Sequence, residues 1–147
     1  MNTSRKGDET EAVVLSRLVE VGLSVSVPFG DGERYDLVVD DGSQLYREQC
    51  KTGSRVNGAI RFNLYISTVS SEGRVDSDYA ADEIDGYAVY SRRMDEVYWI
   101  PIEETRNGEM RSEWTSRNRR HRHRKLTGLT STGLRRCLVD FWCLEST

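Results

Sequence analysis

The sequence contains little cysteine, histidine and lysine, and no run of apolar residues approaches the length of a membrane span. Its three cysteines, an odd number without a CxxC spacing, do not indicate a disulfide framework. The N-terminal residues lack the apolar segment of a secretory signal. We therefore expect a protein without a membrane partner in a reducing cytoplasm.

The two histidines, His121 and His123, lie together in a basic stretch, so no Ser/His/Asp arrangement for nucleophilic catalysis stands out. A P-loop and a dinucleotide-binding fingerprint are both missing. A zinc site built from these histidines with Cys137 and Cys143 would have a spacing that fits no standard zinc motif. The sequence thus argues against several common enzyme classes.

A chain of 147 residues with 37% hydrophobic and 31% charged residues suits one domain spanning residues 1–147. The net charge is −3, but acidic residues dominate residues 1–100 and basic residues dominate the remainder. This asymmetry predicts a basic C-terminal extension, over about residues 105–147, that could bind an anionic partner.

The stretch YDLVVDDGSQLYREQCKT at residues 35–52 predicts a β-hairpin on which the rest of the chain is organised. Residues 35–39 are its first strand, the Asp-Asp-Gly-Ser cluster at 40–43 is its turn, and residues 45–52 are its return strand.

Three polar residues of this hairpin can share one surface. Alternation of side chains along a strand places Gln49 and Lys51 on one face and Cys50 on the other. If Val39 pairs with Gln44 across the turn, Asp36 lies opposite Arg47, and Gln49 is its diagonal neighbour within side-chain reach. The hairpin therefore presents a carboxylate, an amide oxygen and an ammonium together.

This trio suits metal-assisted chemistry on phosphate. Carboxylate and amide oxygens, as in Asp36 and Gln49, are ligands that Mg²⁺ or Mn²⁺ accepts. Lysine occurs only at Lys6, Lys51 and Lys125, and all other basic residues are arginine, so Lys51 suggests a site that needs a compact charge. The alternative is an ordinary cross-strand ion pair between Asp36 and Lys51 with a polar neighbour.

Residues 4–21 have the periodicity of an amphipathic helix that ends at Gly22. Glu11 falls in the centre of the apolar stripe, whereas Glu9 points to the opposite side. A carboxylate on a buried face is costly unless it is paired or binds a metal, and the alternative is a partly exposed residue near the helix end. The stripe consists of Val14, Leu15, Leu18 and Val21.

The remaining patterns predict an α+β domain built around one mixed sheet with flanking helices. We expect strands at residues 23–27, 60–67, 86–91 and 97–102, a polar loop at 53–58, a polar connection at 70–77, a short helical or turn element at 79–84, and a helix at 133–144.

A basic segment within residues 105–128 predicts contact with phosphates, because its positive side chains neutralise their charge. Such contacts carry no information about a base sequence. The alternative is a solvated basic loop. The candidate phosphate-contacting residues, which become predicted DNA contacts if the partner is DNA, are Arg55, Arg61, Arg117, Arg119, Arg120, Arg122, Arg124 and Lys125.

Asp36 followed by Gln49-Cys50-Lys51 resembles the core motif of the PD-(D/E)xK nuclease superfamily, with Gln in place of the second acidic residue. The order of motifs resembles the branch typified by group I intron-associated homing endonucleases, over roughly residues 5–103. The matching motifs are Lys6-Gly7-Asp8, Glu11, Val27-Pro28-Phe29-Gly30-Asp31, Tyr35 to Asp40, Gln49 to Thr52, Tyr79, Asp85 to Tyr90, and Tyr98 to Pro101.

The resemblance implies a restriction-endonuclease-like core and a Mg²⁺ (or Mn²⁺) ion held by Asp36, Gln49, the Cys50 backbone carbonyl and Glu11. It also implies that Lys51 orients or deprotonates a water, or stabilises charge on the phosphate. Two departures stand out: no proline precedes Asp36, and Glu48 lies beside Gln49. A local bulge would make Glu48 the ligand instead.

The function predicted is therefore that of a divalent-metal-dependent DNA endonuclease, homing-like or restriction-like. A Holliday-junction resolvase of the same fold remains an alternative, as does a DNA-binding module without catalytic activity. Cutting two strands or a branched junction needs two active sites, so a homodimer or homotetramer acting on double-stranded or branched DNA is expected.

Overall fold

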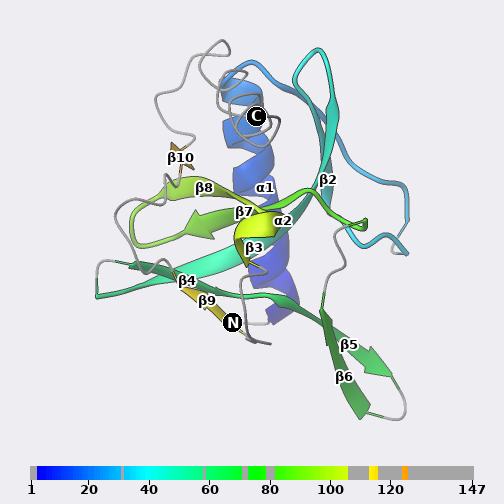
Figure 1. Ribbon diagram of the computed structural model, residues 1–147, viewed down its shortest axis with the longest axis vertical. Helices are drawn as coiled ribbons and strands as arrows, with labels where there is room; N and C mark the ends of the chain where they lie inside the picture. The colour runs from blue at the N-terminus through cyan, green and yellow to red at the C-terminus, as the bar shows by residue number, and fades with distance from the viewer. Residues whose placement is uncertain are drawn as a thin grey trace.

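The computed structural model describes residues 3–30, 32–57, 59–70, 73–78, 82–105, 113–115 and 124–125. Figure 1 shows one long helix behind a mixed β-sheet and a short helix in front of it. The elements are α1 (Thr3–Glu20), β1 (Ser24–Ser26), β2 (Leu37–Asp40), β3 (Leu45–Val56), β4 (Ala59–Asn63), β5 (Tyr65–Ser70), β6 (Gly73–Asp78), β7 (Gly86–Ser91), β8 (Glu96–Pro101), α2 (Ile102–Thr105), β9 (Glu113–Thr115) and β10 (Arg124–Lys125).

The sheet has the order β1-β2-β3-β7-β8-β10, and β3 and β7 are its parallel neighbours. The other pairings of this sheet are antiparallel, so it is mixed, as the sequence predicts. The later part of β3 pairs with β4, and β4 pairs with β9. The long strand β3 thus pairs with β2, β7 and β4.

Two apolar clusters lie on the two sides of the sheet. One joins Val14 and Leu18 of α1 to Leu37 and Val39 of β2. The other contains residues of β4, β7, β8 and α2, including Ile102. The structure confirms the N-terminal helix and the α+β class predicted from the sequence. The helix and the sheet pack together because an apolar helix face and the apolar face of a strand each need a partner to be buried.

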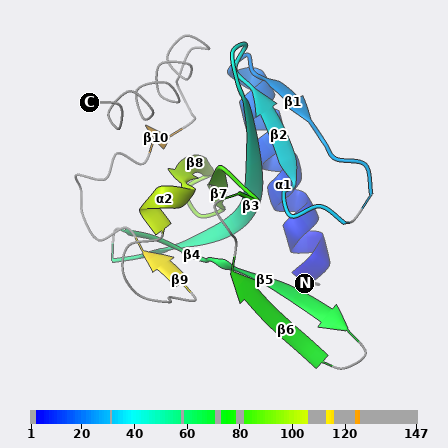
Figure 2. The ribbon, with the colours of Figure 1, turned by 45° about the vertical axis from the view of Figure 1, so that its right-hand side comes forward.

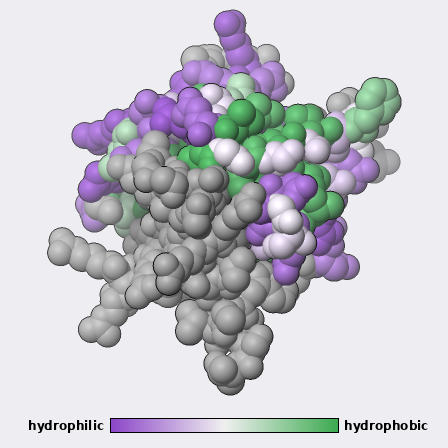
Figure 3. All heavy atoms as spheres, turned by 90° about the horizontal axis from the view of Figure 1, so that it is seen from above, coloured by the Kyte–Doolittle hydropathy of each residue, from purple (hydrophilic) through white to green (hydrophobic). Residues whose placement is uncertain are grey.

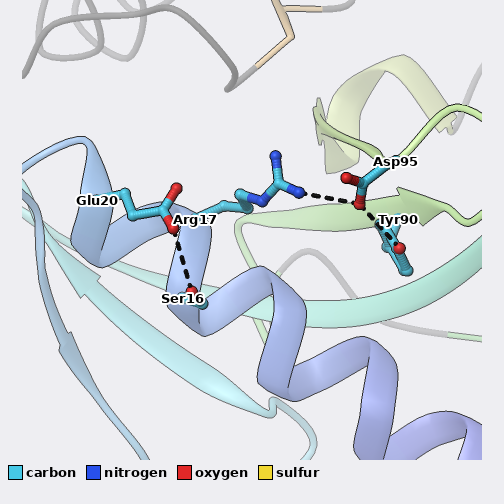
Figure 4. Close-up of polar contacts among 5 residues, drawn as sticks. All are labelled: Ser16, Arg17, Glu20, Tyr90 and Asp95. Carbon is cyan, nitrogen blue, oxygen red and sulfur yellow. Dashed lines mark hydrogen bonds and ion pairs between the residues drawn. The ribbon is translucent and has the colours of Figure 1, made fainter.

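The second half of α1 is tied to the turn between β7 and β8 (Figure 4). Arg17 Nη2 donates to Asp95 Oδ1 at 2.9 Å, and the Tyr90 hydroxyl donates to the same oxygen at 3.1 Å. Within the helix, the Ser16 hydroxyl lies 3.5 Å from Glu20 Oε1. Exposed ion pairs of this kind stabilise a fold only slightly.

The strands β5 and β6 form a separate two-stranded sheet that projects from the body of the molecule (Figures 1 and 2). Two expectations were wrong here. Residues 60–67 are not one strand, because the chain leaves the main sheet at the buried Leu64. Residues 70–77 are not a plain connection, because β6 pairs with β5. Side-chain periodicity reports a strand but not its partner, so it missed both features.

Part of the C-terminal region falls outside the described residues, including the predicted helix at 133–144. Residues 79–81 also fall outside, and residues 82–83 form a turn. No described helix has both the length and the apolar content required to cross a bilayer.

Candidate active site

Asp36 lies just before β2 and faces the middle of β3. Its backbone N–H donates to the Glu48 carbonyl oxygen at 2.9 Å. Its Oδ2 accepts from Gln49 Nε2 at 2.7 Å and from the Cys50 N–H at 2.8 Å. Asp36 and Gln49 are therefore in direct contact.

The predicted register was wrong by two residues. Leu37 pairs with Glu48, so Asp36 comes opposite Gln49 and not opposite Arg47. A shift of two residues preserves the face of each side chain, so the predicted grouping survives.

The turn explains this shift. Asp41 Oδ1 accepts from the N–H groups of Ser43 and Gln44 at 2.8 Å each, and the Asp41 N–H donates to the Gln44 carbonyl. The first ladder pair is consequently Asp40 with Leu45. Gln44 is thereby engaged in the turn, and the strands pair one step further from it.

Burial dominates the electrostatics of Asp36. It raises the pKa of the Asp36 carboxyl, and the Cys50 N–H, the Lys51 ammonium and the Gln49 amide act in the opposite direction. Both hydrogen bonds fall on Oδ2, and no described residue donates to Oδ1. One oxygen of a largely buried carboxylate is therefore available to a ligand.

Lys51 extends from β3 toward the root of the β5–β6 hairpin. Its Nζ donates to the Tyr65 carbonyl oxygen at 2.9 Å. Burial lowers the pKa of Lys51 to about 8, although the nearby Asp36 and Cys50 favour the charged form. Near neutral pH this side chain can therefore both hold and release a proton.

Glu48 and Gln49 lie on opposite faces of β3. The ladder runs unbroken from Leu37 and Glu48 to Asp40 and Leu45, so this part of the hairpin has no bulge. Glu48 is buried, 1% exposed, on the face covered by α1, while Gln49 contacts Asp36. The strand parity predicted from the sequence holds in the structure.

The Glu48 carboxyl is itself unusual. Burial raises its pKa to about 8, the neighbouring Trp99 side chain lowers it, and the charge of Asp85 raises it. Glu48 Oε2 has no partner among the described residues. The indole fits there because Gly86 has no side chain, since a Cβ would lie 2.9 Å from Trp99 Nε1.

Glu11 lies at the margin of the buried stripe of α1. The buried line is Thr10, Val14 and Leu18, spaced one turn apart, and Glu11 is partly exposed, so the expectation that Glu11 lies in the centre was wrong. Burial, the charge of Asp36 and the charge of Asp8 raise the pKa of the Glu11 carboxyl. The effect of the Asp36 charge indicates that Glu11 lies on the side of the helix toward Asp36.

Glu9 points elsewhere, as expected, and its carboxylate pairs with Arg92. Glu11 and Glu9 thus serve different surfaces of one helix.

The Cys50 backbone completes the group. N–H and C=O of one strand residue point to the same strand edge. Because the Cys50 N–H points to Asp36, its carbonyl oxygen faces the same edge. Cys50 itself is a free cysteine whose burial raises the pKa of the thiol well above its usual range.

These groups fit a hard divalent cation by their chemistry. The described residues contain no cluster of three or more His, Cys, Asp or Glu for a metal. The oxygen donors at this place are instead the carboxylates of Asp36 and Glu11, the Gln49 amide and the Cys50 carbonyl. Mg²⁺ and Mn²⁺ accept such mixed oxygen ligands, with water completing the coordination.

Four of the predicted DNA-contacting residues are described, and they do not all lie on one face. Arg55 pairs with Ile60 and Arg61 with Ser54, so the two arginines lie on opposite faces of the β3–β4 ladder. Arg55 Nη1 contacts Met94 Sδ at 3.1 Å.

The last two predicted DNA contacts belong to strand β10. Arg124 pairs with Trp99, and Lys125 pairs with Tyr98, at the edge of β8. The other four, Arg117, Arg119, Arg120 and Arg122, lie outside the described residues.

Sequence reasoning missed one polar contact beside the site. The hydroxyl oxygens of Thr10 and Thr52 lie 2.6 Å apart, between α1 and β3. A signal was present, because Thr10 is a polar residue one turn before Val14 on the buried line. The facing hydroxyl on Thr52 could be identified only from the packing of the helix on the sheet.

Comparison with known proteins agrees with this geometry. The sequence model of a family described as PD-(D/E)XK endonuclease matches residues 1–130. Among solved structures, a bacterial homing endonuclease, I-Ssp6803I, superposes with a TM-score of 0.69 and 21% sequence identity, covering 100% of this chain and 99% of that one. No curated protein matches the chain.

The structural likeness shows that the fold is the restriction-endonuclease-like α+β fold that the sequence predicted. The family match extends beyond residue 103, where the motif resemblance stopped, to residue 130. The chain belongs to the PD-(D/E)XK endonuclease family.

Proposed function

We propose that this nuclease is a divalent-metal-dependent DNA endonuclease of the homing or restriction type. The observation that carries the proposal is the meeting of Asp36, Gln49, Lys51 and the Cys50 backbone at one point of β3. Asp36 there keeps an oxygen without a hydrogen bond from the described residues.

Asp36, Gln49, the Cys50 carbonyl and Glu11 would hold Mg²⁺ or Mn²⁺. When bound, the ion supplies Lewis acidity toward a phosphate oxygen and lowers the pKa of a coordinated water. Gln49 must then turn its amide, because its nitrogen now faces Asp36 and an ion needs its oxygen.

Lys51 has two roles that its pKa of about 8 permits. The neutral amine can accept a proton from an attacking water, and the ammonium can neutralise charge on the phosphate. The Tyr65 carbonyl at 2.9 Å holds the amine in place for either role. Lys51 is thus held in one conformation from which it can act as a proton acceptor or as a positive charge.

The first experiment measures cleavage of supercoiled plasmid and of a synthetic four-way junction with Mg²⁺, Mn²⁺ or EDTA. Wild type is compared with Lys51→Ala and Lys51→Arg, and Ser54→Ala, an exposed position on the same strand, is the control. We expect cutting that needs a divalent ion, falls by a factor on the order of 10²–10⁴ in Lys51→Ala, and is unchanged in the control.

The arginine variant separates the two roles, because arginine keeps its charge and does not release its proton. Activity retained in Lys51→Arg would favour charge neutralisation, and activity lost would favour proton transfer. Unchanged cleavage in Lys51→Ala would refute the assignment of the site. A strong preference for the junction over its duplex arms would favour a resolvase, and DNA binding without cutting under any ion would favour a binding module.

We propose in addition that the enzyme acts as a homodimer or homotetramer, because two strands require two sites. Apolar side chains lie exposed among hydrophilic ones in the view of Figure 3. The exposed large hydrophobic residues include Phe29, which is 105% exposed, and Val27 and Leu45. Light scattering behind a sizing column tests this, and a monomer at micromolar concentration with and without DNA would contradict it.

A further inference from the structure

The contact between Thr10 and Thr52 joins α1 to β3 next to two predicted site residues. Thr10 precedes Glu11 in the sequence, and Thr52 follows Lys51. Their hydroxyl oxygens are 2.6 Å apart, and Thr10 is only 1% exposed. A movement of this contact would therefore move Glu11 relative to Lys51.

Apolar packing also holds α1 against the sheet. Val14 and Leu18 pack into the apolar cluster with Leu37 and Val39. Apolar burial is not directional, so this packing restrains a small slide or roll of the helix less sharply than a directional contact does. A hydrogen bond has a narrow range of distance and angle and does not tolerate it.

The two ion pairs of α1 with the β7–β8 turn restrain it less. Arg17 pairs with Asp95 (Figure 4), and Glu9 pairs with Arg92. Asp95 is 69% exposed and Glu9 is 51% exposed, so water screens both pairs. Long, exposed side chains can also follow a shift of the helix by changing rotamer.

The residue type at position 10 points the same way. Thr10 occupies the buried line that continues as Val14 and Leu18, where valine would fit by shape. Burying a hydroxyl is costly unless it is hydrogen-bonded. The chain nevertheless places hydroxyls at both facing positions, Thr10 and Thr52, and each provides the other's partner.

We propose that the Thr10–Thr52 hydrogen bond fixes the position of α1 along β3 and thereby holds Glu11 at the working distance from Asp36 and Lys51. Thr10 and Thr52 are positioning residues, because they act through Glu11 and Lys51. The inference rests on the proposed function, since Glu11 must serve the metal-dependent reaction for its placement to matter.

The test uses the full-length chain with Thr10→Val and Thr52→Val combined. The double replacement keeps two β-branched side chains and leaves no unpaired buried hydroxyl, and such paired replacements are close to neutral for stability. Thr10→Ser, which keeps the hydroxyl, is the rescue control. Arg17→Gln breaks another contact of α1 at a distance from Glu11 and is the matched control.

Three quantities are measured for each protein: kcat and KM for cleavage, Mn²⁺ affinity in calorimetry without DNA, and the thermal midpoint. We expect the double variant to lose about tenfold to a hundredfold in kcat, because a misplacement of about 1 Å is sufficient for such a loss. Its Mn²⁺ affinity should fall several-fold while its midpoint stays within a few degrees of wild type. Thr10→Ser and Arg17→Gln should keep wild-type kcat and Mn²⁺ affinity.

A double variant with wild-type kcat and Mn²⁺ affinity would overturn the positioning role and leave the nuclease assignment intact. The positioning role would also be overturned if the double variant lost activity only in proportion to a large loss of thermal stability, with Mn²⁺ affinity unchanged. A Thr10→Ser protein that behaves like the double variant would overturn it as well. A wild type that neither cuts DNA nor binds Mn²⁺ would overturn the proposed function, and the positioning role with it.

Discussion

The two ends of the β2–β3 hairpin each carry an aspartate, and their surroundings shift the two pKa values in opposite directions. Burial alone would raise the pKa of Asp41, but hydrogen bonds from Gln44, Ser43 and Tyr46 outweigh it, and the pKa is lowered. For Asp36 burial prevails, and the pKa is raised. The carboxylate of Asp41 is used on both oxygens, whereas Asp36 Oδ1 accepts from no described residue.

This difference separates a carboxylate that stabilises the turn from one that we propose for the active site. Asp41 accepts hydrogen bonds from its own hairpin. These bonds determine the geometry of the turn and therefore the strand register. Asp36 is half-buried with few hydrogen-bond donors, and a cation would offset its charge. Glu48, on the other face of β3, is a third case: it is buried, its Oε2 has no partner among the described residues, and it is directed away from Asp36.

The largest effect should come from Asp36→Asn, which removes the charge but keeps the size of the side chain. We expect cleavage to fall about a thousandfold or more, which corresponds to about 4 kcal/mol of transition-state stabilisation. Thermal stability should stay equal or rise, because a poorly solvated charge is lost. Cleavage kinetics and a thermal melt test this, and retained cleavage would contradict the role given to Asp36.

The next effect is on the pH dependence of stability, through Glu48→Gln. The pKa of Glu48 is raised from 4.5 to about 8, so the folded state binds its proton more tightly than the unfolded state does. Stability should therefore be undiminished by Glu48 below about pH 4.5 and should fall as the pH rises toward about 8. The glutamine should flatten this slope, with a gain on the order of a few kcal/mol at pH 8.

Urea unfolding at several pH values checks the Glu48 prediction. Glu20→Gln, an exposed position on α1, is the control that should leave the slope unchanged. An identical slope in wild type and Glu48→Gln would show that Glu48 is not held protonated.

Asp41→Ala should have the opposite effect to Asp36→Asn: it should lower stability and leave cleavage nearly unchanged. It removes the acceptor of the Ser43 and Gln44 N–H groups, so we expect a loss of about 1–3 kcal/mol in unfolding free energy. Cleavage per folded molecule should remain within about twofold of wild type at low temperature, because in the folded hairpin the β2–β3 ladder and the hydrogen bonds of Gln49 and Cys50 to Asp36 still hold the register. A large loss of cleavage without a loss of stability would erase the contrast between the two aspartates.

The smallest effect should come from Gln49→Glu, which restores the second acidic residue of the family motif. A second carboxylate beside Asp36 should lower the Mg²⁺ concentration for half-maximal cleavage by about several-fold, since carboxylates attract the ion more strongly than amides do. Gln44→Glu makes the same change at the exposed turn and should leave the Mg²⁺ requirement unchanged. Equal Mg²⁺ curves for both variants and wild type would argue that Gln49 does not face the ion.

Much of the site was predictable because strands alternate with a fixed period. Gln49 and Lys51 share a face, and Glu48 lies on the other, for that reason alone. The direct contact of Asp36 with Gln49 was not predictable, because the register depends on how Asp41 organises the turn. The partial exposure of Glu11 also escaped the helical pattern, which cannot say which side of a stripe meets the sheet.

The sequence by itself determined the N-terminal helix, the central hairpin, the shared face of Gln49 and Lys51, and the family, because each depends on local spacing or on the order of motifs. Only the tertiary structure decided the partners: which strand follows Leu64, which hydroxyl faces Thr10, and which carbonyl holds Lys51. Those contacts join residues far apart in the chain. They follow from how the helix and the strands pack, and no local pattern of side chains encodes that geometry.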